Sequence, residues 1–353
     1  MDLKLTEEQQ MLRDAVRSLC ERLSTVEIVR SLEGDEKGYS EDLWNELVRM
    51  DLVGLLVDGP HHVEVAVVCE ELGRALAPSP YIETAVFGAA LLGTADRTAS
   101  VAWHEPERSD TEAGIAATLD ESTVTGEKIL VPFAKSVEQL LVLARSGDEV
   151  VVVSVEPGAA TAELEGTLAA DARYRVLLDH TPGTVVATGW DAFEQAATPT
   201  LVAIAAYAVG AATKAHEMSV EYANERIQFD KPIGSYQAMA HPLADLRTEI
   251  DGSRTLVHQA AWALAEQRDA YALSRMAKYY ACDVFRRTAK FGHQVFGGIG
   301  FTLDIDIQLF MRRAKQLEVT WFGPRTLQEA IAGAELDAPE PLISPDAVAS
   351  GAT

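Results

Sequence analysis

A stretch of strand-forming sequence interrupts a chain that is otherwise patterned for helices. From about Arg97 to Ala196, short runs rich in β-branched residues, among them "STVTGEKILVPF" and "EQLLVLARSGDEVVVVSVE", are divided by Gly, Asp and Pro. Such runs predict an antiparallel sheet or barrel, and Gly147-Asp148 lies where a hairpin turn is expected. A chain with this order of patterns is expected to fold as an α+β protein.

Helical periodicity dominates the segment before the strands. "LTEEQQMLRDAVRSLCERL" places apolar residues at helical spacing, and Thr6 with Gln9 three residues later is a capping-box pattern that predicts a helix start. "EDLWNELVRMDLVGLL" and "VEVAVVCEELGRALAP" predict two or three further helices, the last of which is ended by Pro78 and Pro80. We therefore expect an N-terminal helical domain over residues 1–96.

Long helices return after the strands. The first stripe begins near Pro199 and consists of Leu201, Ile204, Ala205, Ala208, Ala212, Ala215 and Met218. Further stripes begin at Met239, Met276 and Ile307, and long helices packed by small and apolar residues predict a four-helix bundle. The expected domains are thus a middle antiparallel β-barrel domain over 97–196, a C-terminal helical bundle over 197–336, and a flexible Pro- and Ala-rich tail over 337–353.

The net charge excludes several kinds of partner. The chain has 54 acidic and 30 basic residues, a net charge of −24, so it repels phosphate backbones and anionic membrane surfaces. No nucleic-acid or membrane partner is therefore expected. No window has the uninterrupted apolar length of a transmembrane helix. No secretory signal is visible, so the expected location is the cytoplasm.

The three cysteines are expected to be structural. Cys20, Cys69 and Cys282 are too widely spaced for a metal cluster, so each is expected to be a buried apolar residue.

The most informative segment is "YANERIQFDKPIGSYQAMAHPLADL", residues 222–246. It resembles the acyl-CoA dehydrogenase signature R-x-Q-F-G-x-P-I-x-x-F-Q followed by H-x-L-A-D. "QVFGGIGFTLDIDIQLFMRRAK" is similar to that family's Q-x-x-G-G-x-G-y segment and R-D-A-K helix, and "GEKILVPFAKSVEQLLVLAR" and the opening helix also resemble their counterparts. These matches run in the right order from Leu5 to about Ala332, and they imply the fold of that family with FAD as cofactor.

The resemblance implies a role in FAD binding for one set of residues. In the family these positions hold the adenosine diphosphate end of the FAD bound in the neighbouring subunit, whereas the flavin ring lies against the β domain of the reacting subunit. Carried over to this chain, the set is Arg226, Gln228, Phe229, Gln237, Gln294, Gly297 and Gly298. The residue types suit a dinucleotide, because a guanidinium matches a pyrophosphate, amides can bond adenine and ribose, and glycines allow close backbone approach. Taken without the resemblance, the residues also fit ordinary local packing, with Arg226 paired to Glu225 or Asp230.

No catalytic base stands where the resemblance would put it. The family's reaction removes an α-proton from an acyl-CoA while a hydride passes to the flavin, and a positioned carboxylate takes the proton. In most members the carboxylate immediately precedes a glycine after the R-D-A-K helix, but here Trp321 and Phe322 precede Gly323. The position used by some other members falls near Thr200, and the nearest acid, Glu194, is expected before the helix. We therefore expect no catalytic residue in this chain.

Two further motifs of the family's own active site are altered. The loop T-E-P-x-x-G-S-D reads "WHEPERSD", so bulky Trp103 and His104 occupy the entrance and the glycine is lost. The strand that backs the flavin reads "LVP", and Pro132 has neither an N–H nor a hydroxyl to offer the ring. The residues expected to build this chain's own site are thus changed, whereas those expected to reach a neighbour's FAD are kept.

This pattern is similar to that of one subunit in the heterotetrameric bacterial acyl-CoA dehydrogenases known chiefly from steroid side-chain degradation. In those α2β2 enzymes one subunit carries the catalytic glutamate and the flavin pocket, and the other completes the FAD site. The resemblance implies a partner subunit with that glutamate, an electron-transfer acceptor, and an acyl-CoA substrate for which the subgroup suggests a steroid side chain. This chain alone is then expected to be inactive.

Three alternatives fit parts of the sequence. A homotetrameric dehydrogenase would need a relocated base, for which Glu318 and Glu105 are candidates, although Glu318, Glu221 and Glu225 also fit solvated helix faces or ion pairs. A flavin monooxygenase on the same fold would need no such base. A non-catalytic paralogue would stabilise an assembly without contacting FAD.

Overall fold

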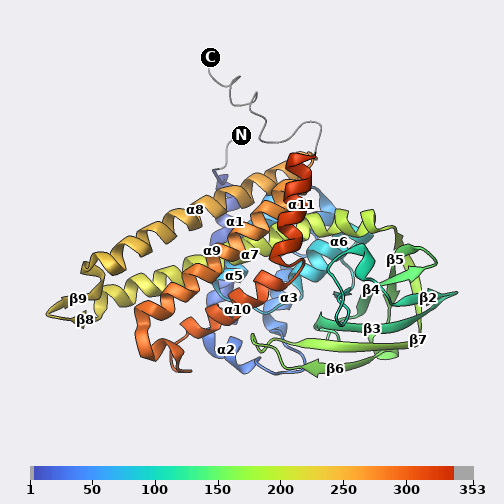
Figure 1. Ribbon diagram of the computed structural model, residues 1–353, viewed down its shortest axis with the longest axis horizontal. Coiled ribbons are helices and arrows are strands. Elements are labelled where there is room, and N and C mark those ends of the chain that lie inside the picture. Colours follow the sequence, from blue (N-terminus) through green and yellow to red (C-terminus); the bar gives the residue numbers. More distant parts are fainter. Residues whose placement is uncertain (1–3, 338–353) are drawn as a thin grey trace, which may run out of the picture.

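The computed structural model describes residues 4–337, so the expected flexible tail lies outside the described residues except for Asp337 (Figure 1). The predicted capping box is confirmed, because the Thr6 side chain accepts from the Gln9 N–H (3.2 Å) and the Gln9 side chain accepts from the Thr6 N–H (3.0 Å). The N-terminal region is helical, as predicted, and comprises α1 (Glu7–Leu23), α2 (Val26–Ser31), α3 (Glu41–Arg49), α4 (Leu55–Asp58), α5 (His62–Arg74), the π-helix η1 (Ile82–Gly88) and α6 (Ala89–Leu92).

The middle region is a seven-stranded sheet. Strands β4, β2, β3, β7 and β5 pair in this order and β5 pairs again with β4, so five strands close a ring, in agreement with the expected barrel. The predicted hairpin is confirmed, since Ser146 pairs with Glu149 across Gly147-Asp148. Contrary to a purely antiparallel sheet, β1 and β2 pair with β4 in parallel. Neither strand is joined to β4 by a hairpin, because β3 lies between them and β4 in the chain. The strands are β1 (Ala99–Ala102), β2 (Thr118–Asp120), β3 (Thr123–Pro132), β4 (Gln139–Ser146), β5 (Glu149–Val155), β6 (Thr161–Glu165) and β7 (Arg173–Thr188).

The C-terminal region is a bundle built around one central helix. This helix, α7, contacts α5, α8, α9 and α10, and α11 packs against α9. The predicted apolar stripe of α7 is buried from Leu201 to Ala215. The elements are α7 (Trp190–Glu225), α8 (Gln237–Ala265), α9 (Tyr271–Phe296), α10 (Ile307–Val319) and α11 (Pro324–Leu336).

The expected start of the central helix near Pro199 is wrong. Helix α7 begins at Trp190 and runs through the proline, so Glu194 lies inside the helix rather than before it. An internal proline removes one helical hydrogen bond. Here the hydroxyls of the flanking Thr198 and Thr200 donate to backbone carbonyls one turn earlier (2.9 and 2.8 Å). Tertiary burial of the helix outweighs the local cost of the proline.

Among the described residues, α7 is the one helix long and apolar enough to cross a membrane. This corrects the expectation that no segment meets that length and composition. Of its most apolar window, 89% is buried inside the protein. The apolar surface of α7 therefore forms the core of the bundle.

Helices α5 and α7 approach each other closely at two glycines. A Cβ on Gly73 would lie 1.9 Å from the carbonyl oxygen of Tyr207, and one on Gly210 would lie 1.8 Å from the carbonyl oxygen of Glu70. No larger side chain fits between these backbones, so glycine sets the distance at which the N-terminal helices meet the bundle.

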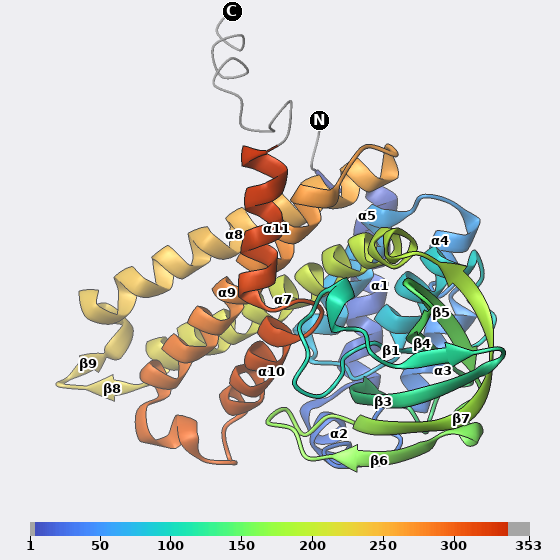
Figure 2. The same ribbon diagram turned by 45° about the vertical axis from the view of Figure 1, so that its right-hand side comes forward.

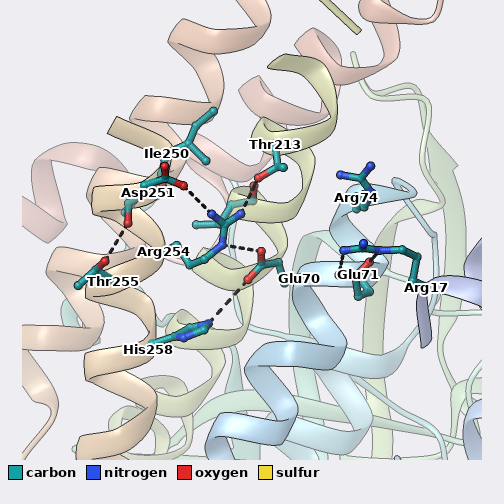
Figure 3. A network of polar contacts seen from close by, with 12 residues as sticks. Arg17, Glu70, Glu71, Arg74, Thr213, Ile250, Asp251, Arg254, Thr255 and His258 are labelled. Carbon is teal, nitrogen blue, oxygen red and sulfur yellow. Dashed lines mark hydrogen bonds and ion pairs between the residues drawn. The ribbon is translucent and has the colours of Figure 1, made fainter. Parts of the chain in front are cut away.

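An ion-pair network joins α5 to α8 beside this contact (Figure 3). Arg254 on α8 donates to the Glu70 carboxylate on α5 (2.8 Å) and to the Thr213 hydroxyl on α7 (2.8 Å), and His258 lies 3.8 Å from the same carboxylate. Burial raises the pKa of Glu70, but the neighbouring His258 and Arg254 outweigh burial and hold that pKa below its ordinary value. The N-terminal helices are thus fixed to the bundle by both packing and charge.

Helix α7 connects the sheet to a short hairpin. Its first residue follows β7 of the sheet, whereas its last residue leads into the short hairpin of β8 (Ile227–Gln228) and β9 (Lys231–Pro232). In Figures 1 and 2 the sheet and this hairpin lie at opposite ends of the molecule. A helix of 36 residues is about 54 Å long, so the hairpin is remote from the sheet of its own chain.

Candidate functional site

Arg226 caps the end of α7 and begins the exposed segment that was predicted to bind FAD. Its backbone N–H donates to the Tyr222 carbonyl (2.9 Å), and its carbonyl accepts from the Ile233 N–H (2.8 Å). The side chain is exposed and makes no hydrogen bond or ion pair with any residue that the structure describes, Glu225 and Asp230 included. A fixed backbone therefore presents to the surroundings a guanidinium that has no partner among the described residues.

The hairpin turn displays Gln228 and Phe229. Gln228 pairs with Lys231 across the turn, and Phe229 (φ 53°) and Asp230 (φ 66°) between them adopt the left-handed backbone of a tight hairpin. The Tyr236 hydroxyl donates to the Gln228 carbonyl (3.2 Å), and the Lys231 ammonium lies 4.1 Å from the Tyr236 ring. These contacts hold the base of the turn and leave Phe229 86% exposed.

The remaining predicted residues lie at the same end of the bundle. Gln237 begins α8, Gln294 lies in the last turn of α9, and Gly297 and Gly298 open the short helix η5 (Gly297–Phe301). A small separate core ties these segments to the hairpin; it is formed by Ala223, Leu243 and Val295 with Ile233 and Met239 packed against them. The structure therefore brings all the predicted FAD residues to one end of the molecule.

The glycines at this end leave room for another molecule. Gly297 has a left-handed backbone (φ 65°) that favours glycine. A Cβ added at Gly297 or Gly298 would meet nothing within 4 Å. The open space beside these backbones is compatible with close approach of a ligand or a second chain.

Sequence reasoning missed two residues of this surface. Phe301 and Leu303 follow the glycines and are 79% and 73% exposed. Ile227 and Phe229 of the hairpin are also large apolar residues with exposed side chains, so both segments at this end of the molecule present apolar surface to the surroundings. The available signal was the pair of large apolar residues in "GGIGFTLD", a Gly-containing segment without helical periodicity.

At the opposite end, the turn after α10 occupies the position that the resemblance assigns to the catalytic base. Trp321 (φ 54°) and Phe322 (φ 71°) both have left-handed backbones and are buried. The Lys278 ammonium on α9 donates to the carbonyls of Glu318 (3.0 Å) and Phe322 (2.9 Å). The Gly323 N–H donates to Asp110 (3.1 Å). Hydrogen bonds to Lys278 and to Asp110 thus fix the turn.

Aromatic side chains fill the space around this turn. The Trp321 ring stacks on Phe193 of α7 at a centroid distance of 5.9 Å and lies 5.1 Å from Phe87 of η1. Trp103 lies 5.9 Å from Trp321 and 5.2 Å from Phe322. We call these five side chains, Phe87, Trp103, Phe193, Trp321 and Phe322, the aromatic cluster. The bulky Trp103 predicted at the entrance is therefore part of a packed core.

The strand that corresponds to the flavin-backing strand has its backbone groups engaged within the protein. The Leu130 N–H donates to the Glu165 carboxylate (3.1 Å), and the Leu130 carbonyl accepts from Arg173 (3.3 Å). The Pro132 carbonyl accepts from the Ser100 hydroxyl. Since proline has no N–H, this strand leaves no backbone donor at Leu130 or Pro132 for a flavin ring.

The carboxylates considered as relocated bases are also engaged. Glu105 is buried, where it accepts from Lys128 (2.6 Å) and from the N–H groups of Ala116 (2.9 Å) and Ala117 (3.0 Å). Glu318 pairs with Arg286 (2.9 Å) and Lys315 (2.5 Å).

The other two positions that were considered hold no free base. Glu194 pairs with the buried Arg275 (3.3 Å), and the buried Thr200 hydroxyl donates to its own helix. His104, which was predicted at the entrance, contacts the Asp110 carboxylate (3.1 Å). Each acid near the sheet end of α7 that was considered as a base thus has a structural partner.

The two ends of the molecule differ in how well they fit FAD. Beside Phe322 the structure has a cavity of about 240 Å³ that also contacts Asp110 and Arg275, smaller than the roughly 300 Å³ at which small-molecule sites begin. The aromatic cluster and the engaged strand do not fit a flavin ring at this end. The hairpin end, by contrast, has exposed amides, open glycines and an Arg226 side chain without a partner among the described residues. These groups suit a dinucleotide held from one side.

Two family models match this chain. The model described as acyl-CoA dehydrogenase, C-terminal domain, matches residues 187–336, and that described as acyl-CoA dehydrogenase, N-terminal domain, matches residues 6–100. Acyl-CoA dehydrogenase IpdE2 of Mycobacterium tuberculosis is 31% identical over 87% of this chain and 91% of its own length. IpdE2 of Mycolicibacterium smegmatis is 29% identical over 88% of this chain and 93% of its own length.

Solved structures resemble the whole chain. The ChsE4-ChsE5 complex from Mycobacterium tuberculosis matches with a TM-score of 0.86 and 25% identity, covering 96% of this chain and 100% of that one. Tcur3481-Tcur3483, described as a steroid ACAD, matches with a TM-score of 0.84 and 26% identity, covering 98% of this chain and 99% of that one. Butyryl-CoA dehydrogenase from Megasphaera elsdenii shares the fold, with a TM-score of 0.84 at 22% identity over 95% of this chain and 99% of its own.

Proposed function

The chain belongs to the acyl-CoA dehydrogenase family, and from this premise we propose that it is the subunit without a catalytic base in a heteromeric, FAD-dependent member of that family. Its partner is an unlike subunit that carries the catalytic glutamate and the flavin pocket. This chain completes the partner's FAD site with its hairpin end, in an α2β2 assembly with one FAD for each unlike pair.

The observation that carries the proposal is the contrast between the two ends of α7. At the sheet end, Trp321 and Phe322 are packed where a base would stand, and the aromatic cluster fills the surrounding space. At the hairpin end, Arg226 is exposed and unpaired among the described residues. Because α7 holds the hairpin far from its own sheet, residues of the hairpin end serve a flavin only when that flavin is bound by another chain.

The similar solved structures support a partner of the same family. ChsE4-ChsE5 is a complex of two differently named proteins, and Tcur3481-Tcur3483 likewise pairs two names. The second is described as a steroid ACAD, so we infer that the substrate of the complex is an acyl-CoA with a steroid-derived side chain. The electrons then leave the flavin for an electron-transfer acceptor.

The chemical division between the subunits follows from the residues. FAD supplies the acceptor for the hydride that leaves the acyl group. Arg226 would pair with the pyrophosphate, and Gln228, Gln237 and Gln294 would bond the adenosine end. Phe229 would cover an apolar face of the neighbouring chain or nucleoside. The α-proton is removed by the partner's base, since no free carboxylate stands beside Phe322 in the part of this chain that the structure describes.

The test replaces Arg226 in the co-purified complex. Arg226→Ala is expected to weaken FAD binding at least tenfold while the unlike subunits still co-purify, because one charge-assisted contact to the pyrophosphate is lost and the hairpin backbone is unchanged. Arg325→Ala, which removes a 90%-exposed arginine of α11, is the matched control and should keep full flavin content. If Arg226→Ala also keeps its FAD with unchanged affinity, the chain is a non-catalytic paralogue that does not contact the cofactor.

A further inference from the structure

A separate cavity lies between the N-terminal helices and the bundle, away from both the hairpin end and the aromatic cluster. It has a volume of about 330 Å³ and is bounded by α1, α2, α5, α7 and α10, which places it within the range of roughly 300–1,000 Å³ for small-molecule sites. This chain builds the whole of its described wall, and the proposed FAD contacts use none of its residues.

The interior of the cavity is apolar. Its buried surface comes from Val29 of α2, Leu76 after α5, and Leu309 and Phe310 of α10, each at most 6% exposed. Met218 of α7 adds a flexible side chain that adapts to different shapes. Such a wall favours the apolar body of a ligand over a polar one.

Nitrogen donors gather at the rim of the cavity. Arg17 of α1 and Arg74 of α5 stand beside each other there (Figure 3), and Lys214 of α7 joins them. Arg17 is bonded to Glu71 (2.9 and 2.7 Å) and Arg74 to Glu217. The Lys214 ammonium makes no hydrogen bond or ion pair with the residues that the structure describes. The Lys214 charge already helps to lower the pKa of Glu217, but among the described residues this ammonium has no hydrogen-bonded partner. The rim therefore has one ammonium that can donate to a ligand, and further N–H groups on two positioned guanidinium groups.

The acids of the rim limit the charge of a ligand. Asp306 is already paired with Arg30 (2.8 Å), and Glu71 with Arg17. Glu21 is exposed at the edge of the same cavity. A polyanion such as a nucleotide would meet repulsion from these carboxylates, whereas a single carboxylate can reach Lys214 and the arginine donors.

We propose that this cavity binds a small amphipathic acid, with the apolar body against Leu309 and Phe310 and the single carboxylate at Lys214. The site is additional to the proposed FAD contacts and does not depend on them. Two helices of its wall are continuous with the hairpin end, because α7 continues from Met218 to Arg226 and α10 follows η5 in the chain. A ligand here therefore contacts α7 and α10, which are each continuous with a segment of the hairpin end.

Binding is tested with decanoate as the probe, by titration calorimetry on the full-length chain in the form in which it purifies, alone or with its partner. We expect saturable decanoate binding that weakens at least tenfold in Lys214→Met, which keeps the aliphatic stem and removes the charge. Val26→Phe, at the partly exposed edge of the cavity, should weaken binding to a similar degree by filling the entrance. Lys290→Met, which removes an exposed lysine of α9, is the control and should bind as the unmodified chain does.

Two related probes separate the contributions of head and body. 1-Decanol and decylamine share the apolar chain, and both should bind at least tenfold more weakly than decanoate. Equal binding of the three probes would overturn the assignment of the carboxylate to Lys214. Decanoate binding that is absent, or that neither Lys214→Met nor Val26→Phe changes, would overturn the site itself. These results are independent of FAD content, so they do not bear on the proposed function.

Discussion

The buried ammonium of Lys278 donates a hydrogen bond to the carbonyl oxygen of Phe322, at 2.9 Å. Burial lowers the pKa of Lys278, and on the other side of the turn Asp110 accepts from the Gly323 N–H. Burial raises the pKa of Asp110, but His104, Gly323 and Lys278 outweigh burial and hold it below its ordinary value. The turn at the position that the resemblance assigns to the catalytic base is therefore a fixed part of the core, held by two charged groups.

This packing predicts that a carboxylate alone does not restore catalysis. Phe322→Glu places an acid next to Gly323, where most members of the family have one, but the neighbouring space remains filled by the aromatic cluster. The lone variant is expected to show no acyl-CoA dehydrogenase activity in a dye-reduction assay. Its free energy of unfolding should fall by about 3 kcal/mol or more, because a carboxylate is buried without a partner.

Phe229→Glu is the matched control for that substitution. Phe229 is 86% exposed, and surface substitutions usually change stability by no more than about 0.5 kcal/mol. Urea denaturation should therefore separate the two variants clearly. A Phe322→Glu chain that oxidises an acyl-CoA by itself would show that the flavin pocket of this chain is intact.

The aromatic cluster is expected to carry a large share of the stability at the sheet end of α7. Trp321→Ala removes a ring that contacts Phe87, Phe193 and Trp103. Truncation of such a buried ring costs about 3–5 kcal/mol. Trp262→Ala, which removes a partly exposed ring stacked with Arg268, should cost much less in the same urea titration. Equal losses in the two variants would contradict a packed cluster.

The Glu70 network predicts a loss of stability in acid. The folded chain holds the pKa of Glu70 below its ordinary value, so the unfolded chain binds the proton more readily. The stabilisation is therefore complete above the ordinary carboxyl pKa and is lost as the pH falls through the lower, folded-state pKa. Glu70→Gln should cost about 3 kcal/mol at neutral pH, since Arg254 and His258 lose their partner.

The Glu70→Gln loss should shrink as the solution is acidified, because the unmodified chain then also loses the charge. Urea titrations at neutral pH and at a series of pH values from 4 downward measure this difference. Glu149→Gln, in the exposed turn of the β4–β5 hairpin, is the control and should have little effect at either pH. A Glu70→Gln loss that stays constant across the range would contradict the lowered pKa.

The close approach of α5 and α7 predicts opposite results for two glycine-to-alanine substitutions. Gly210→Ala places a Cβ 1.8 Å from the Glu70 carbonyl oxygen, so the helices must separate, at a cost of about 3 kcal/mol. Gly252→Ala in α8 meets nothing within 4 Å and should stabilise the chain by about 0.4–1 kcal/mol, because the unfolded state loses freedom. Thermal unfolding distinguishes the two; a stabilised Gly210→Ala variant would contradict the tight contact.

Local signals in the sequence predicted much of the fold. The Thr6–Gln9 capping box and the Gly147-Asp148 turn depend on residues within a few positions of each other, and both are confirmed. Pro199 misled the placement of α7, because the burial that keeps a proline inside a helix comes from distant elements. The parallel pairing of β1 with β4 was not predicted, since pairing across a long connection leaves no local signal.

The sequence predicted the motif residues of the candidate site but not the side chains that pack around them. The resemblance located Arg226 and the altered base position from short runs of sequence. Phe87, Trp103, Phe193 and Trp321 lie far apart along the chain, so only the fold reveals that they pack together. Lys278 was likewise missed, because a lysine on a helix is usually exposed and nothing nearby in the sequence indicates the carbonyls that it binds.

The measurement that tests the central claim most directly is native mass together with FAD content, for this chain alone and for the chain co-expressed with a family member that carries the glutamate. We expect the lone chain to contain no flavin and the pair to form an α2β2 assembly with one FAD for each unlike pair. A lone chain that forms a homotetramer with about one FAD per subunit and oxidises an acyl-CoA would contradict the account.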